Sequence, residues 1–264
     1  DAIIHLAAYL GVRRTEINPL RCLEINITGT KNVIEMAINA GVKKIVFASS
    51  SEVYGEPLSN PINETCITQG KTVYGISKLA GEELLKAYSK RYQNLNFSIL
   101  RYFNTYGINQ ISQFVIPKFI RSVSENKSPV IYGDGNQSRS YCYSSDTAWA
   151  TVQALLEEKA DGETINIGNS EEPKNLKELA NMIINIMGKK DKIKPMLKKS
   201  FDSTDRTEDR EIVNRFCDTT KARKILKYKP KITLEQGIKM VVDHGVLYPN
   251  WLTTDEYYTI DDYL

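Results

Sequence analysis

Short apolar runs along the first 110 residues predict buried strands that alternate with helices. Three such runs, at residues 2–8, 43–51 and 96–102, have the length of strands buried on both faces. Between them, residues 21–40 place apolar side chains on one helical face, and residues 72–92 predict a second helix. This alternation indicates a doubly wound α/β sheet, in which ligands bind beyond the carboxyl ends of the strands.

The second half of the chain has a looser pattern, which predicts a smaller mixed α/β lobe. Helices are expected at residues 114–124, 146–159, 176–188, 218–226 and 234–246, and strands at 130–132 and 163–167. Residues 199–214 are polar and irregular, and residues 247–264 form an aromatic, acidic tail without periodicity. The loops of this lobe provide surface for a ligand.

The composition is typical of a globular protein and argues against several kinds of partner. Of 264 residues, 41% are hydrophobic and 25% are charged, which is enough for a sizeable core. The net charge of +3 is too small to indicate nucleic-acid binding. No apolar run reaches the length of a membrane span and no signal peptide is visible, so no membrane association is expected.

Cysteine and histidine usage indicates a reducing compartment and no metal. The four cysteines lie far apart without metal-ligand spacing, as expected of reduced thiols in a cytoplasmic protein. Two histidines are too few for a histidine-based zinc site. The chain begins at Asp1 without a methionine and continues directly into an apolar strand, so we expect a fragment.

Tyr74 and Lys78 lie one helical turn apart, so both side chains can face one cleft. A tyrosine with its ordinary pKa near ~10 is a poor base at neutral pH, but a nearby cation favours the phenolate. Tyr74 could then take a proton from a substrate hydroxyl. The same spacing is also typical of a partly exposed helix face, so this pair alone does not decide the function.

Seven short motifs follow one another along the chain, up to about residue 237. They are HLAA at residues 5–8, Asn26-x-x-Gly29-Thr30, SSSEVYG at 49–55, Tyr74-x-x-x-Lys78, RYFN-x-YG at 101–107, Gly133-Asp134-Gly135 with Arg139, and Asp218-x-x-Lys221-Ala222. In this order the chain resembles the extended short-chain dehydrogenase/reductase family, the nucleotide-sugar epimerases and dehydratases. Each motif is weak by itself, and the combination is specific.

The resemblance implies a Rossmann-like sheet that binds NAD. It assigns residues 1–110 to the C-terminal part of the NAD-binding domain, with the catalytic residues. Residues 111–264 form mainly a substrate-binding lobe, with some segments returning to the sheet. The family's N-terminal strand and glycine-rich loop are missing, since none of the 15 glycines forms that fingerprint. We expect the full-length protein to bind NAD and this chain to bind it poorly or not at all.

The resemblance also assigns residues to the cofactor. Lys78 would bond the nicotinamide ribose and depress the pKa of Tyr74. Asn26 would lie beside the active site and hold structure or a water near Lys78, although a plain helix residue is the alternative. The other cofactor contacts that it implies are Leu6, Ala7, Ala8, Ser49 and Tyr102.

The partner that the resemblance implies is a nucleotide-diphosphate sugar. Ser50 would bond the sugar hydroxyl that Tyr74 deprotonates. The other substrate-binding residues would be Asn104, Val115, Arg139 and Arg206. Of these, Asn104 would contact the diphosphate, and the two arginines would form charge-assisted bonds to phosphate or base.

Members of this family share a first step, the oxidation of a sugar hydroxyl to a 4-keto sugar, and then diverge. In a 4-epimerase of the UDP-glucose type, the first expectation, the keto sugar turns over in the pocket and is reduced on its other face. In a 4,6-dehydratase of the dTDP-glucose or GDP-mannose type, Glu52 would remove the C5 proton. In a UDP-glucuronate decarboxylase, the third alternative, a β-keto acid loses carbon dioxide.

The residues after Ser50 favour the epimerase by a small margin. Glu52 stands where dehydratases of this family keep their base. Ser51 stands where many of them keep an aspartic acid, and a hydroxyl is far too weak an acid to replace it. The residues after Tyr74 lack the pattern of the uronate decarboxylases.

A different class also stays open. The chain could be a degenerate module that binds a nucleotide sugar without redox chemistry, since it lacks a phosphate-binding glycine loop. An intact Ser50, Tyr74 and Lys78 argues against that alternative. The resemblance further implies a homodimer formed by the helices at 21–40 and 72–92. The base and the sugar are not specified by the sequence.

Overall fold

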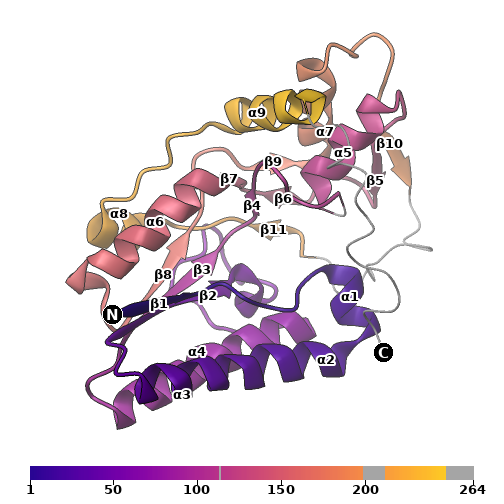
Figure 1. Cartoon of the computed structure of the whole chain (residues 1–264). Helices are drawn as coiled ribbons and strands as arrows, with labels where there is room; N and C mark the ends of the chain where they lie inside the picture. Colours follow the sequence, from indigo (N-terminus) through magenta and orange to yellow (C-terminus); the bar gives the residue numbers. More distant parts are fainter. Residues whose placement is uncertain (113, 199–211, 248–264) are drawn as a thin grey trace.

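The computed structural model describes residues 1–112, 114–198 and 212–247, and a parallel sheet lies at the centre of the fold. The order across the sheet is β1 (Ala2–His5), β2 (Lys44–Ser50), β3 (Asn96–Tyr102) and β8 (Glu163–Ile167) (Figure 1). β2 and β3 are buried along nearly their whole length, as their apolar runs predict. The predicted doubly wound α/β sheet is confirmed.

Helices cover both faces of this sheet (Figure 1). The main ones are α3 (Gly29–Asn39) and α4 (Val73–Arg91) on one face, and α6 (Ser144–Leu156) and α8 (Thr220–Leu226) on the other. Successive residues of β2 enter opposite cores, since Phe47 packs with the first pair of helices and Val46 with the second. The sheet is therefore fixed from both sides, and its carboxyl edge is held rigidly.

The predicted helix at residues 21–40 contains an irregular turn. Helix α2 (Pro19–Leu23) begins after Asn18, and a π-helix (Glu24–Thr28) joins it to α3. Helix α1 (Val12–Ile17) was not predicted, because six residues with a single polar face show too little periodicity. A π-helical turn widens the backbone locally and is frequent at functional sites.

The second half forms a smaller lobe around helices α5, α7 and α9. Its elements are α5 (Val115–Ser124), α7 (Leu176–Ile186), α9 (Leu234–Leu247), β4 (Thr105–Tyr106), β5 (Val130–Tyr132), β6 (Ser138–Arg139), β7 (Cys142–Tyr143), β9 (Lys174–Asn175), β10 (Met196–Lys198) and β11 (Asn214–Arg215). Apart from β5, these strands were not predicted, because segments of two or three residues carry no periodicity. β8 returns from this half to the central sheet.

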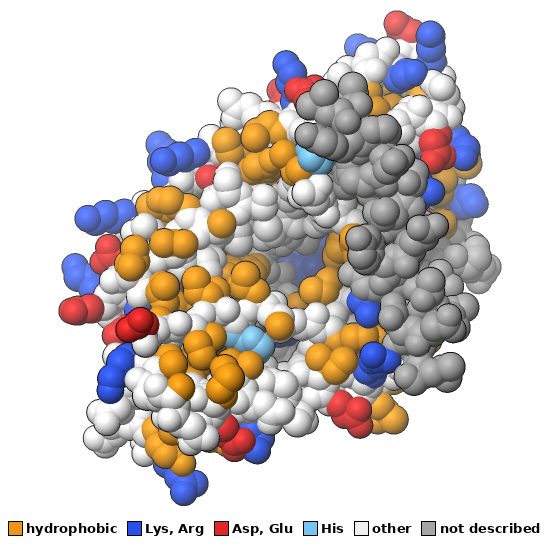
Figure 2. All heavy atoms as spheres, in the orientation of Figure 1, with side chains coloured by type: hydrophobic (Ala, Val, Ile, Leu, Met, Phe, Trp, Pro, Cys, Tyr) orange, Lys and Arg blue, Asp and Glu red, His pale blue; other side chains and the backbone are white. Residues whose placement is uncertain are grey.

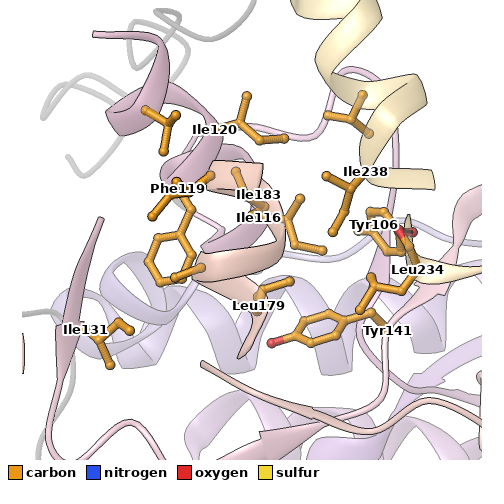
Figure 3. Packing of buried hydrophobic residues seen from close by; sticks show 14 of the residues in the cluster. Tyr106, Ile116, Phe119, Ile120, Ile131, Tyr141, Leu179, Ile183, Leu234 and Ile238 are labelled. Atoms are coloured by element: carbon orange, nitrogen blue, oxygen red, sulfur yellow. Dashed lines mark hydrogen bonds between the residues drawn. The ribbon is translucent and has the colours of Figure 1, made fainter. Parts of the chain in front are cut away.

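The lobe has a hydrophobic core of its own (Figure 3). Ile120, Ile183 and Ile238 bring α5, α7 and α9 together, and the rings of Tyr106 and Tyr141 pack edge to face at 6.4 Å. The predicted helices of this half are thereby confirmed. The irregular segment and the tail expected at 199–214 and 247–264 lie almost wholly outside the described residues.

Candidate active site

Ser50 and Tyr74 lie where β2 ends and α4 begins, close enough for the Ser50 hydroxyl to lower the pKa of the Tyr74 phenol. Ser50 is the last residue of β2, and its hydroxyl accepts a bond of 3.2 Å from the backbone nitrogen of Glu52. That bond caps the 3-10 helix Ser51–Tyr54. The serine at the strand end is therefore both a cap and a partner of the phenol.

Gly75 allows the first turn of α4 to lie close against the 3-10 helix Ser51–Tyr54. A Cβ on Gly75 would lie 2.6 Å from the carbonyl oxygen of Glu52, which no side chain tolerates. The backbone nitrogen of Gly75 donates a bond of 3.0 Å to the Thr72 hydroxyl, which caps α4. The first turn of α4 is thus fixed against the 3-10 helix, and Tyr74 with it.

Lys78 lies one turn further along α4 and is only 3% exposed. Its ammonium donates a bond of 2.7 Å to the carbonyl oxygen of Ala48 and lies 5.8 Å from the centroid of the Tyr74 ring. Burial lowers the pKa of Lys78 to about 8. The structure brings the two side chains together, as their spacing predicts.

The pKa of Tyr74 differs from what the resemblance implies. Burial raises it above its ordinary value, the negative charge of Glu52 raises it further, and the bond with Ser50 lowers it. The Lys78 ammonium, 5.8 Å from the centroid of the Tyr74 ring, bonds the carbonyl oxygen of Ala48. The lowering of the Tyr74 pKa by Lys78, which the resemblance implies, stays a prediction.

Glu52 is held by an arginine from the other half of the chain. Nη1 of Arg215 lies 2.5 Å from Oε1 of Glu52, and the Thr72 hydroxyl lies 3.5 Å from Oε2. The two charged side chains are 9% and 25% exposed. A carboxylate bonded to a guanidinium is a poorer proton acceptor than a free one. Arg215 was not predicted, and its distance of 163 positions from Glu52 gives no sequence signal.

Asn26 has a defined structural role in the π-helix. Its side chain exchanges two bonds with the backbone of Tyr9, at 2.7 and 3.0 Å, and donates a third of 2.9 Å to the Ser77 hydroxyl. Ser77 precedes Lys78 on α4 and donates to the carbonyl of Tyr74 at 2.8 Å. Asn26 therefore joins the chain after β1 to the helix that carries Tyr74 and Lys78.

The other residues assigned to the cofactor differ in their exposure to solvent. Leu6 is 58% exposed and Ala7 is also exposed, so the backbone after β1 is accessible. Ser49 is buried and donates to Glu82, while the Tyr102 hydroxyl bonds Thr151 at 2.7 Å. Contact of these residues, and of Ala8, with a cofactor stays a prediction.

Two residues assigned to the substrate already bond backbone of the lobe. The Asn104 amide donates to the Ser140 carbonyl at 3.1 Å, and its own φ of 35° is unusual for a residue other than glycine. Arg139 donates to the carbonyls of Ile212 and Val213, at 2.5 and 3.1 Å. Both therefore position β6 and β11 beside the site. Val115 begins α5, and Arg206 lies outside the described residues.

The residues around Lys78 fit the nicotinamide-ribose end of NAD. An ammonium has three donors, and in the part of the chain that the structure describes Lys78 uses one of them, on Ala48. The remaining donors and the hydroxyls of Ser50 and Tyr74 offer polar partners for ribose and sugar hydroxyls. Figure 2 shows a hollow between the sheet and the lobe, with basic side chains at its floor.

Comparisons with known proteins agree with this geometry. A family model described as NAD dependent epimerase/dehydratase family matches residues 1–168. The chain is 37% identical over 247 residues to a putative UDP-glucose 4-epimerase of Methanocaldococcus jannaschii, covering 92% of this chain and 76% of that one. It is 36% identical over 250 residues to a UDP-N-acetyl-alpha-D-glucosaminuronate decarboxylase of Bacillus cytotoxicus, covering 92% and 75%.

Solved structures show the same similarity. The UDP-glucose 4-epimerase of Thermotoga maritima with UDP-glucose superposes with a TM-score of 0.84 at 31% identity, over 93% of this chain and 77% of that one. The UDP-glucuronic acid 4-epimerase of Bacillus cereus with UDP-glucuronic acid and NAD gives 0.83 at 31% identity, over 94% and 76%. The expected Rossmann-type epimerase/dehydratase relationship is confirmed, and the chain belongs to the NAD dependent epimerase/dehydratase family.

Proposed function

We propose that the protein catalyses 4-epimerisation of a nucleotide-diphosphate sugar, with a UDP-sugar as the first candidate. The observation that carries the proposal is the position of Tyr74, which lies next to Ser50 and has the buried ammonium of Lys78 5.8 Å from its ring centroid. Two relatives, at 37% and 33% identity, are named as a putative UDP-glucose and a UDP-glucuronate 4-epimerase. The chemistry of such a reaction needs one proton-transfer group and no second acid.

The residues of the site would act as follows. The Tyr74 phenolate accepts the proton of the sugar C4 hydroxyl, and the Ser50 hydroxyl bonds the same oxygen and shares the proton as it leaves. The positive charge of the Lys78 ammonium lies near the Tyr74 phenol and favours its phenolate form. NAD bound beside Tyr74 and Lys78 would supply the hydride acceptor for the oxidation at C4 and the hydride donor for the later reduction. Tyr74 then gives the proton back to the C4 oxygen.

Dehydration is supported less well. Glu52, its expected base, is bonded to Arg215 at 2.5 Å. Its neighbour Ser51 is 2% exposed and is no acid at neutral pH. An elimination needs a free base at C5 and an acid at C6, and neither is evident at these two positions. The dehydratase therefore remains the weaker alternative.

One observation favours a second candidate, decarboxylation of a nucleotide-linked uronic acid. Arg215 reaches the site with its Nε buried and unpaired among the described residues, and a guanidinium is suited to bind a carboxylate. The relative at 36% identity is named as a decarboxylase of a glucosaminuronate. This candidate and the epimerase share the first step, so Tyr74 has the same role in both.

The deciding experiment is incubation of the full-length protein with NAD and a panel of UDP-, dTDP- and GDP-sugars that includes UDP-glucuronate. Products are identified by mass spectrometry and by proton NMR in deuterated water. An unchanged mass with an inverted C4 centre and no deuterium at C5 supports the epimerase. Loss of carbon dioxide supports the decarboxylase, and loss of water with deuterium at C5 supports the dehydratase. A protein that binds the sugar and converts none of them is the degenerate module.

We further propose a homodimer formed through α3 and α4. Ile25 in the π-helix before α3, Met36 on α3 and Ile76 on α4 are 42%, 56% and 48% exposed, an apolar surface that a second copy would cover. Light scattering tests this, and a monomer at micromolar concentration excludes it. A cytoplasmic location stays a prediction from the cysteine usage; the described helices include none long and apolar enough to span a membrane.

A further inference from the structure

A buried ion pair lies directly behind the active site. The Arg101 guanidinium donates two hydrogen bonds to the Glu82 carboxylate, from Nε to Oε1 at 2.9 Å and from Nη2 to Oε2 at 2.6 Å. The side chains are 5% and 0% exposed. A buried pair of this kind gains little net stability, because removing two charges from water costs about as much as their attraction returns. Stability alone is therefore a weak reason for its presence.

The pair is extended by hydrogen bonds at both ends. The Ser49 hydroxyl donates to Oε1 of Glu82 at 2.5 Å. At the other end, Nη1 of Arg101 donates to the Tyr54 hydroxyl at 2.9 Å, and that hydroxyl donates to Oδ1 of Asn166 at 2.7 Å. Burial raises the pKa of Tyr54 to about 12, so the phenol keeps the proton that it donates. Each of these groups is oriented by its neighbours.

Each of three segments that carry the active site contributes one member of this network. Ser49 directly precedes Ser50 on β2. Glu82 lies on the same face of α4 as Tyr74, at twice the four-residue spacing that separates Tyr74 from Lys78. Tyr54 closes the 3-10 helix that contains Glu52. The network members are Ser49, Tyr54, Glu82, Arg101 and Asn166.

We propose that this network, with the Glu82–Arg101 ion pair at its centre, positions Ser50 against Tyr74. The inference rests on the proposed function, to which it adds positioning residues that do not touch the substrate. A bidentate guanidinium fixes both distance and angle between β3 and α4, and its bond to Tyr54 fixes the 3-10 helix in the same frame. A shift of about 1 Å between reacting groups can lower a rate by about a hundredfold, so such a frame matters for catalysis.

The test uses Tyr54→Phe, which removes one hydroxyl from the network and leaves the ring in place. Its matched control is Tyr228→Phe. Tyr228 is as buried as Tyr54, at 1% exposure, and its hydroxyl bonds the Cys142 thiol at 3.2 Å in the hydrophobic core that includes residues of α6 and α8. Ser49→Ala is the second network variant and the milder one. Hydrogen–deuterium exchange is followed in the full-length protein without ligands, and kcat and KM are measured on the NAD-loaded full-length protein with the sugar that it converts.

If the network positions the site, Tyr54→Phe and Ser49→Ala speed exchange at residues 50–55 and 73–78, and kcat falls about tenfold with KM within about twofold. Tyr228→Phe leaves both unchanged. Equal kcat for all three variants, or exchange that rises evenly over the whole chain, overturns the proposal. If the parent protein converts no sugar, the proposed function fails, whereas the local exchange change still reports on the network.

Discussion

Nη1 of Arg215 lies 2.5 Å from Oε1 of Glu52 and joins β11 of the lobe to the carboxyl end of β2. This contact places the lobe directly over the strand end that carries Ser50. It also neutralises the carboxylate that would serve as the base of an elimination. The lobe and the segment after β2 are thus joined by this ion pair.

Removing that arginine should destabilise the protein. Arg215→Met removes the guanidinium that is bonded to the partly buried Glu52 carboxylate, and we expect the free energy of unfolding to fall by about 1–3 kcal/mol. Urea denaturation of this variant, of Glu52→Leu and of the double variant measures the coupling between the two residues. Strictly additive losses would show that the pair contributes no interaction energy.

Neutralising Glu52 should shift the pH dependence of activity. The negative charge of Glu52 raises the pKa of Tyr74, so Glu52→Gln lowers that pKa and increases the phenolate fraction at a given pH. The acidic limb of log kcat/KM should therefore move to lower pH, and 4-epimerisation should persist. Glu56→Gln, at a half-exposed carboxylate a few residues further on, is the control. Complete loss of turnover in Glu52→Gln would instead point to elimination.

Lys78 should make the stability depend on pH at alkaline values. Its pKa is about 8 in the folded protein and near ~10.5 when unfolded, so between these values the unfolded chain binds more protons. Stability therefore rises as pH increases from about 8 to about 10.5. Lys78→Met should stabilise the protein by up to about 3 kcal/mol below pH ~8, a gain that disappears by pH ~10.5.

The measurement is thermal unfolding of the parent and of Lys78→Met between these pH values. Lys86→Met serves as the control, because Lys86 lies on the same helix and is 38% exposed. A parent protein whose stability is flat across this window would show that Lys78 keeps an ordinary pKa.

Replacing Gly75 by alanine should lower stability and activity, although alanine has a higher helix propensity than glycine. Its Cβ would meet the Glu52 carbonyl oxygen at 2.6 Å, so the first turn of α4 must move. We expect Gly75→Ala to lower stability by about 1–3 kcal/mol and to weaken the bond between Ser50 and Tyr74, which reduces kcat. Gly29→Ala, where no atom lies within 4 Å, should instead be neutral or stabilising by up to about 1 kcal/mol. Equal effects at both positions would contradict this packing argument.

The sequence predicted the elements that are long enough to show a repeating pattern of apolar and polar side chains. The strands at 96–102 and 163–167 have the predicted bounds, because short segments with β-branched and other apolar residues between helical patterns are typical of strands in an α/β protein. The pairing of Tyr74 with Lys78 also follows from spacing alone, since a helix fixes the relation of residues four apart. By contrast, strands such as β6 and β11 are two residues long and exist only through their partners.

The sequence by itself determined the sheet, its helices and the local pair Tyr74 and Lys78, all of which depend on short-range periodicity. Only the tertiary structure decided the two ion pairs, between Arg215 and Glu52 and between Arg101 and Glu82. It also decided the direction of the Tyr74 pKa, which follows from burial and from the charge of Glu52. Such contacts join residues far apart in the chain, and distance and burial exist only once the chain has folded.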